Sequence, residues 1–117
     1  MPREDEHLQK AIHNESFADS LDLSERCNLE WAITALFYSA IHYIEAYFAR
    51  CGVHCLDHNQ RAREIARDPS IRLIFQDYRE LQTLSTAARY SARVFAEREY
   101  RLHAKPSLQR IKSATGH

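Results

Sequence analysis

The spacing of apolar residues along the chain predicts five helices and no strands. Apolar side chains recur at intervals of three and four residues, which is the period of an amphipathic helix. The predicted helices cover residues 5–21, 29–50, 58–67, 69–90 and 96–114. Short connections place neighbouring helices antiparallel. The sequence therefore predicts an all-α, single-domain antiparallel bundle of four to five helices over residues 1–117, with flexible ends at 1–6 and 113–117.

The most apolar predicted helix, residues 29–50, is expected to lie at the centre of the bundle. Apolar side chains cover about half of its circumference. Segment 31–49 has the length of a membrane span, but it contains His42 and Glu45. A carboxylate inside a span costs about 2.5–3.5 kcal/mol, so we expect no contact with a membrane. The helix also carries a strip of small residues, where another helix can approach closely: Ala32, Ala35, Ser39 and Ala46.

Capping residues and proline predict where the helices begin and end. Ser24 or Asn28 is expected to cap the helix 29–50, and Gly52 is expected to end it in the left-handed conformation. Pro106 lies inside the last helix, where it should kink or split the helix, because proline donates no backbone hydrogen bond. The start signals of the two remaining helices are Asp57 for 58–67, and Asp68 with Pro69 for 69–90.

Charge is balanced overall but uneven along the chain. Lysine plus arginine and aspartate plus glutamate each number 16 in 117 residues. Residues 1–48 carry 3 basic and 9 acidic side chains, whereas residues 89–117 carry 7 basic and 2 acidic ones. This asymmetry fits solvated helix faces, a basic surface that contacts phosphate, or an acid–base match between two subunits. The chain has only 2 glycines, which excludes a glycine-rich phosphate loop.

The three cysteines and the N-terminus indicate an intracellular protein. No apolar run follows Met1, so no signal peptide is expected, and a cytoplasmic location with reduced thiols is predicted. Cys51, His54, Cys55 and His58 have the ligand types of a zinc site. Four ligands within eight residues are unusually close together, so we favour a loop at a helix end and predict no metal and no cofactor.

Polar residues on three predicted helices form a candidate pocket or network. Tyr38, His42 and Glu45 recur at helical spacing, so they could hydrogen-bond in sequence. A histidine between a phenol and a carboxylate serves either as a general base or as part of a buried network. His58 and Arg61, one turn apart, either hold an anion or bond within the protein. The fourth helix could contribute Tyr78, Arg89 and Tyr90.

The last helix carries Arg98 and His103 in an R-x4-H arrangement. A cation that holds a phosphodiester and a histidine that moves a proton are the minimum requirement for metal-independent RNA cleavage. The composition allows roughly 0.8 such pairs by chance, so the spacing alone is a weak signal.

Several segments together resemble a HEPN domain. The run WAITALFYSAIHYIEAYFA at 31–49 resembles the second helix of that family. Gly52-Val53-His54 followed by His58 and Arg61, Tyr78-Arg79-x-Leu81 and Ala88-Arg89-Tyr90 resemble a compact, largely uncharacterised HEPN-like group. The resemblance implies a four- or five-helix bundle, a homodimer, and either RNA binding or metal-independent RNase activity in a toxin or defence system.

The same resemblance implies a partner such as an antitoxin or a nucleotidyltransferase. Arg98 and His103 match the catalytic motif of the wider family in spacing and rough position, although Glu99 and Pro106 depart from its pattern. In the compact group this region carries no catalytic pair, so the resemblance favours a polar pocket or network between the second and fourth helices over a nuclease site. The characteristic polar residues of that group correspond to Tyr38, His42, His58, Arg61, Tyr78, Arg89 and Tyr90. Three hypotheses follow: an RNA-associated protein, a non-catalytic homodimeric interaction module, and a protein with an internal small-molecule pocket. Whether the protein is an enzyme stays open at this stage.

Overall fold

Helices form all of the regular secondary structure of residues 2–117, the part of the chain that the computed structural model describes. This confirms the predicted all-α bundle. The described residues form five helical segments. The first four are α1 (Glu4–Ser20), α2 (Arg26–Arg50), α3 (His58–Arg67) and α4 (Phe75–Tyr90), and a 3-10 turn (Arg72–Ile74) precedes α4. In the fifth segment, α5 (Glu97–Glu99) continues through a π-helical turn (Tyr100–Ala104) into α6 (Lys105–Ala114).

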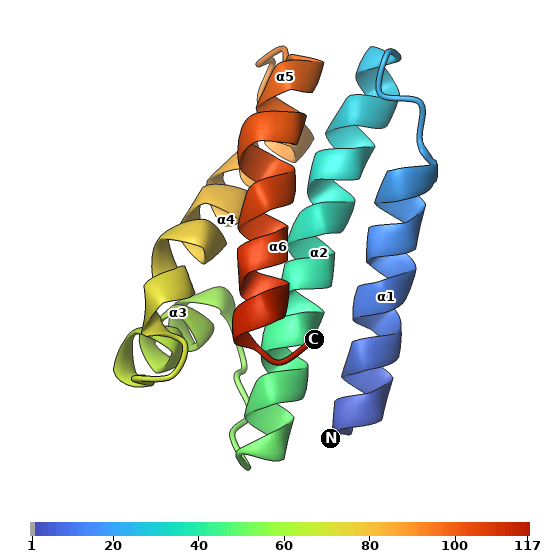
Figure 1. The fold of residues 1–117 in the computed structure, drawn as a ribbon. Coiled ribbons are helices and arrows are strands. Elements are labelled where there is room, and N and C mark those ends of the chain that lie inside the picture. The colour runs from blue at the N-terminus through green and yellow to red at the C-terminus, as the bar shows by residue number, and fades with distance from the viewer. Residues whose placement is uncertain (1) are drawn as a thin grey trace.

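Helix α2 lies at the centre and contacts α1, α4 and α6 (Figure 1). Helices α1, α2 and α6 run side by side, and α3 lies at one end of the bundle beside α4. Among the residues described, no helix combines the length and apolar character that crossing a membrane requires. The core is built from large side chains of α2, α4 and α6: Leu36, Phe37, Ile44, Phe48, Tyr78, Leu81, Leu108 and Ile111.

The small-residue strip of α2 is covered by α1. The Ser39 hydroxyl donates a hydrogen bond of 2.8 Å to the backbone carbonyl of Ala11, so the two helix backbones lie very close together. Ala32, Ala35 and Ala46 are buried as well. The close approach that the sequence predicted therefore occurs within one chain, and this strip is not available to a second subunit.

The apolar face predicted for α1 is only partly correct. Ala11 and Ala18 are buried against α2, whereas Ile12 and Phe17 are about half exposed. Only small side chains fit where α1 approaches α2, and position 12 is turned about 100° from position 11 along a helix. Ile12 and Phe17 therefore lie on the two flanks of α1, outside its contact with α2.

The N-terminal cap predicted for α2 is wrong. The helix begins at Arg26, three residues earlier than expected, with Glu25 in the cap position. The Ser24 hydroxyl instead donates to the Asp22 carboxylate at 2.7 Å, and Asn28 lies inside the helix. Local side-chain bonding in the turn therefore occupies the residue that looked like a cap.

Two other boundary predictions are confirmed. Gly52 has a φ of +76° and follows the last turn of α2. The Val53 amide donates to the Phe48 carbonyl at 2.8 Å, the bonding pattern of a Schellman motif. Asp57 caps α3, because its carboxylate accepts a 2.7 Å hydrogen bond from the backbone amide of Gln60.

The fourth helix begins later than predicted, at Phe75 instead of Pro69. Asp68 caps a turn there, since its carboxylate accepts from the Ser70 amide at 2.8 Å and from the Tyr47 hydroxyl at 2.7 Å. Pro106 does not split the last helix. A π-helical turn precedes it and helical structure continues to Ala114, so the missing proline donor is accommodated by a change in helix type.

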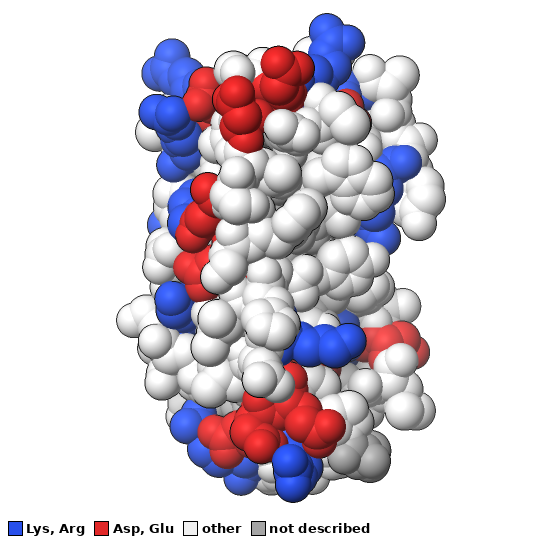
Figure 2. Space-filling view, turned by 90° about the vertical axis from the view of Figure 1, so that its right-hand side faces the viewer, with Lys and Arg blue, Asp and Glu red and all other residues white. Residues whose placement is uncertain are grey.

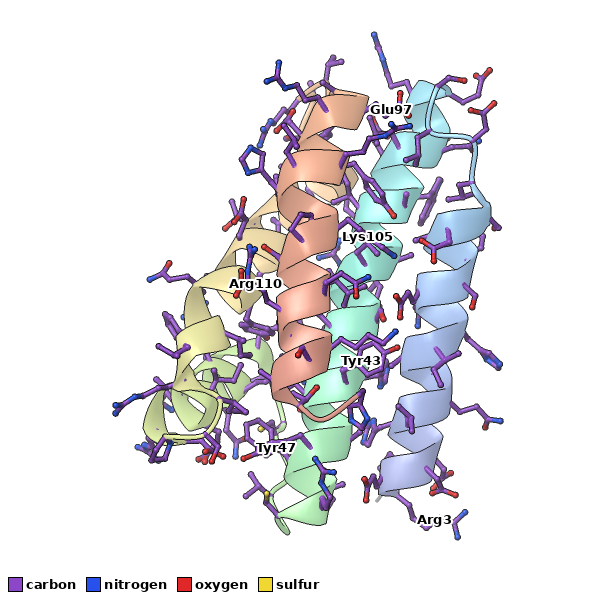
Figure 3. The ribbon with its side chains drawn as sticks, viewed as in Figure 1. Arg3, Tyr43, Tyr47, Glu97, Lys105 and Arg110 are labelled. Carbon is purple, nitrogen blue, oxygen red and sulfur yellow. The ribbon has the colours of Figure 1, made fainter. Side chains whose placement is uncertain are left out.

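Ion pairs between α1 and α6 bring the acidic and basic ends of the chain together. Glu15 accepts a 2.7 Å hydrogen bond from the Tyr43 hydroxyl and lies 3.2 Å from the Lys112 ammonium. Lys105 lies 2.8 Å from Asp19, and both Tyr43 and Lys105 point toward α1 (Figure 3). Much of the acid–base match that the charge distribution indicated is therefore made within one chain.

Residues near both ends make contacts within the described range, while Met1 of the segment 1–6 that was predicted to be flexible lies outside that range. Helix α1 already begins at Glu4, and the Glu6 carboxylate accepts a hydrogen bond from the Arg3 amide at 3.0 Å. At the other end Thr115 is buried, and its carbonyl accepts from the Arg50 guanidinium at 3.0 Å.

Candidate functional site

Arg61 of α3 is the centre of a buried polar network that joins three helices. Its Nε donates to the Glu45 carboxylate of α2 at 2.7 Å. Its Nη1 lies 2.8 Å from His58 Nδ1 and donates to the Tyr78 hydroxyl of α4 at 3.1 Å. The structure thus brings together four of the predicted site residues, and we call them the Arg61 cluster.

Burial assigns the Arg61 cluster a structural role. Arg61 is 7% exposed and Glu45 is 5% exposed, while Tyr78 is fully buried. A buried charge needs a partner of opposite charge, and here the Arg61 guanidinium and the Glu45 carboxylate are partners. Helix α3 buries only Ala62 and Ile65 besides Arg61, so the ion pair is its main polar attachment to α2. An external anion has no free access to this guanidinium.

His58 is held in its neutral form by the same cluster. Burial, then the positive charges of Arg61 and Arg89, lower the pKa of His58 below its ordinary value. Because a guanidinium only donates, His58 Nδ1 must accept the bond from Arg61, and the ring proton lies on Nε2. The ring also lies 5.4 Å from the Phe37 ring, centre to centre.

His42 has a different partner from the one that helical spacing suggested. Its Nδ1 lies 3.0 Å from Nδ1 of His7 on α1, so one imidazole donates and the other accepts. Burial, and then the neighbouring His7, lower the pKa of His42 to about 4. The predicted sequence of bonds from Tyr38 through His42 to Glu45 does not form, because each residue bonds to another helix.

Arg89 forms an exposed cluster with aromatic residues of α2 and α4. Its Nη1 donates to the Tyr38 hydroxyl at 3.1 Å, and its Nε donates to the Ser85 carbonyl at 3.2 Å. The guanidinium carbon lies 5.7 Å from the centre of the Tyr38 ring and 5.1 Å from that of Tyr90. These are cation–π distances. Among the described residues no carboxylate pairs with Arg89.

A groove of about 350 Å³ lies beside Arg89, between the first half of α2 and the end of α4. We call it the α2–α4 groove. Trp31 is 56% exposed and Tyr90 is 78% exposed, so both rings present large faces to solvent. Its lining comes from both helices: Glu30, Trp31, Thr34, Ala88, Arg89 and Tyr90.

Sequence reasoning placed Arg89 and Tyr90 in a candidate pocket but did not include Glu30, Trp31 or Thr34. A signal for two of them was present, since Trp31 and Thr34 share one side of helix α2 with Tyr38. The predicted pocket residues are divided among the Arg61 cluster, the histidine pair and the edge of the groove. The described structure therefore does not unite these residues in a single internal pocket.

Arg98 and His103 lie near each other in sequence but have different surroundings. Arg98 lines a shallow surface groove with Glu97, Arg101 and Leu102, and His103 is not part of that lining. His103 Nδ1 lies 3.8 Å from the Glu80 carboxylate of α4. Within residues 2–117 no hydrogen bond joins the two side chains. One chain alone therefore does not assemble them into a site.

The cysteine and histidine residues after α2 do not converge. Burial and the nearby Glu45 carboxylate raise the pKa of the Cys55 thiol to about 12, while Cys51 is exposed. His58 uses Nδ1 for Arg61. Over the described range no three His, Cys, Asp or Glu side chains are placed to hold a metal ion.

Comparisons of the chain with protein-family models, curated proteins and solved structures found no match. These comparisons leave the HEPN-like resemblance untested. The geometry of the α2–α4 groove is therefore the basis for the function proposed below.

Proposed function

We propose that this is a HEPN-like, RNA-associated protein that binds single-stranded RNA at the α2–α4 groove. The observation that carries the proposal is Arg89, which has no carboxylate partner in the described chain and lies over Tyr38 and Tyr90 beside exposed Trp31. Unpaired bases stack on aromatic rings and on arginine planes. Each stacked base contributes about 1–3 kcal/mol of binding free energy.

Exposure of these rings supports a binding role. A tryptophan and a tyrosine that contribute to the core would be buried, as Phe37 and Tyr78 are. Trp31 and Tyr90 instead line a groove whose width is set by two helices of the core. Because both helices pack in the core, the backbone that carries the two rings is in place before a ligand arrives, which reduces the entropy lost on binding.

The distribution of free cations also supports a modest electrostatic contribution. Of the 7 basic residues in 89–117, five pair with acidic side chains of the same chain: Arg93, Arg101, Lys105, Arg110 and Lys112. Arg89 and Arg98 have no such partner in the described range. The proposed RNA contact is thus driven by stacking, with few phosphate contacts.

In this proposal the protein acts in the cytoplasm, alone or with a partner such as an antitoxin or a nucleotidyltransferase. The RNA contact itself needs neither partner, because every residue of the α2–α4 groove comes from one chain.

Fluorescence anisotropy with a short, labelled single-stranded RNA tests the proposal. Tyr90→Ala and Trp31→Ala should each weaken binding about tenfold or more, because each removes a stacking surface. Leu73→Ala is the matched control, since Leu73 is an exposed apolar residue on the turn before α4 and outside the groove. Equal affinity of all four proteins, or no binding by the wild type, would contradict the proposal.

A homodimeric interaction module without nucleic-acid activity is the second candidate function. Helix α1 exposes Ile12 and Phe17, one on each flank. Figure 2 shows the side of the molecule on which α1 lies, where a broad uncharged area occupies the middle and acidic side chains gather toward the two ends. A centre with few charged side chains and a charged rim is typical of a protein interface.

Size-exclusion chromatography with light scattering tests this second candidate. It predicts a dimer for the wild type and a monomer for Phe17→Gln. Leu56→Gln is a suitable control, because Leu56 is an exposed apolar residue in the loop before α3. A wild-type monomer at micromolar concentration would remove this candidate.

A further inference from the structure

The α2–α4 groove contains one charged group that RNA binding by stacking alone does not use. Glu30 lines the groove together with Trp31 and Tyr90, and its side chain is only partly exposed. None of the cations in the described chain forms an ion pair with it. Thr34 cannot satisfy the carboxylate either, since its hydroxyl donates to the Glu30 backbone carbonyl at 3.0 Å.

A carboxylate without an ion-pair partner beside two aromatic rings favours a planar ligand. The rings stack on the ligand, and the carboxylate accepts hydrogen bonds from donors along its edge. A carboxylate has two acceptor oxygens and no donor, so it is best satisfied by two neighbouring N–H groups. Guanine presents N1–H and the N2 amino group side by side on its Watson–Crick edge. Adenine and cytosine each place an acceptor next to their amino group, and uracil flanks its N3–H with two carbonyls.

We propose that the α2–α4 groove recognises a guanine base of single-stranded RNA. The base stacks on Trp31 and Tyr90, and the Glu30 carboxylate accepts hydrogen bonds from N1–H and the N2 amino group. This inference rests on the proposed RNA-binding function and adds the identity of the base.

The size and charge of the groove fit one nucleotide. A volume of about 350 Å³ is at the lower end of the range for small-ligand sites, which suits a single base with its ribose but not a folded or double-stranded RNA. The Arg89 guanidinium, 5.1 Å from the centre of the Tyr90 ring, supplies a positive charge for the adjoining phosphate. The same charge disfavours an organic cation, the other ligand that an aromatic site with a carboxylate could attract.

The fluorescence of Trp31 gives a direct measurement, because Trp31 is the single tryptophan of the chain. The probes are short uridine oligonucleotides that carry one central guanosine, adenosine or cytidine, and an all-uridine oligonucleotide. We expect the guanosine probe to bind about tenfold more tightly than the other three, which is the discrimination expected of one bidentate pair.

Two carboxylate variants test the role of Glu30. Glu30→Gln replaces one acceptor by a donor, so the preference for guanosine should fall to within about threefold while the affinity for the all-uridine probe changes little. Glu64→Gln is the matched control, because Glu64 is also partly exposed but lies on α3, outside the groove. It should keep the preference of the wild type. Thermal melts of both variants confirm that they are folded.

The outcomes separate this inference from the proposed function. Binding that quenches Trp31 equally with all four probes would overturn the guanine inference and leave RNA binding intact. A guanosine preference that Glu30→Gln retains would also overturn it. No binding of any probe would overturn both proposals.

Discussion

Arg61 and Arg89 have similar local partners but opposite surroundings. Each guanidinium donates a 3.1 Å hydrogen bond to a tyrosine hydroxyl, Arg61 to Tyr78 and Arg89 to Tyr38. Arg61 also has the Glu45 carboxylate at 2.7 Å and is buried with it. Arg89 has aromatic rings and a backbone carbonyl, and it faces a groove.

The difference between the two arginines lies in the carboxylate. An arginine whose charge is matched inside the protein stabilises the fold, because removing either partner leaves a buried charge. An arginine whose charge is unmatched retains the capacity to bind an anion or to stack on a base. The predictions below test whether this distinction holds.

Arg61→Met should have the largest effect. It leaves the Glu45 carboxylate buried without a partner, so we expect the free energy of unfolding to fall by about 3–5 kcal/mol. Urea denaturation followed by circular dichroism measures the loss. The double variant Glu45→Leu with Arg61→Met should recover most of it, because both charges are then absent. A loss below about 1 kcal/mol in the single variant would show that the pair is not needed for stability.

Acid should destabilise the protein through the pair of His7 and His42. Both imidazoles have a lowered pKa in the fold, that of His42 about 4 against an ordinary 6.5. The unfolded chain therefore takes up protons first, and stability is complete above pH 6.5 and falls toward pH 4. We expect a loss of about 1–2 kcal/mol over that range, because partial exposure of the ring reduces the full shift.

The control for this pH dependence is a pair of glutamine variants. His42→Gln should make the stability profile between pH 6.5 and 4 shallower, because the imidazole whose pKa is lowered to about 4 is then absent. His7 and His58, whose pKa values are also lowered, leave a smaller slope. His13→Gln, on the exposed side of α1, should keep the wild-type profile. A steep profile in His42→Gln would assign the acid sensitivity to another group.

RNA binding should depend only weakly on salt. Arg89 and Arg98, the two basic residues of 89–117 without an acidic partner in the described range, give a slope of about −1.4 for the logarithm of affinity against the logarithm of salt concentration. Anisotropy titrations across a range of potassium chloride concentrations measure it, and Arg98→Gln should make the slope shallower. A slope several times steeper would mean that the ion pairs between α1 and α6 open to contact phosphate.

RNA cleavage should show no dependence on His103. Arg98 and His103 have separate surroundings in one chain, so a mixed RNA pool in EDTA should remain intact with the wild type and with His103→Ala alike. Cleavage by the wild type that His103→Ala abolishes would instead identify a metal-independent RNase site, completed by a second copy of the chain.

Periodicity in the sequence was sufficient to predict the helices and the central place of α2. Apolar spacing reports on local structure, and signals such as Gly52 and Asp57 act within a few residues of themselves, so both are readable from the chain. Asp68 and Pro69 predicted the wrong start for the fourth helix, because the contact that Asp68 makes involves a residue distant in sequence. The Tyr47 hydroxyl, which comes from α2, binds the Asp68 carboxylate, and no local pattern reveals that contact.

The partners of the polar residues could not be predicted, because they depend on how helices meet. His42 sits beside His7 only because α1 runs back along α2. Glu15 meets Lys112 across the bundle for a similar reason. The groove was partly predictable, since the sequence already indicated Arg89 and Tyr90 as candidate site residues. Glu30 and Trp31 line the groove because α4 packs against α2, which no local pattern reveals.

Arg89→Ala, measured for both RNA affinity and stability, tests the central claim most directly. We predict that its affinity for a short single-stranded RNA falls about tenfold, while its free energy of unfolding stays within about 1 kcal/mol of the wild type. An affinity equal to that of the wild type would contradict the assignment of the α2–α4 groove as the RNA site. A loss of stability as large as that of Arg61→Met would contradict the distinction between the two arginines.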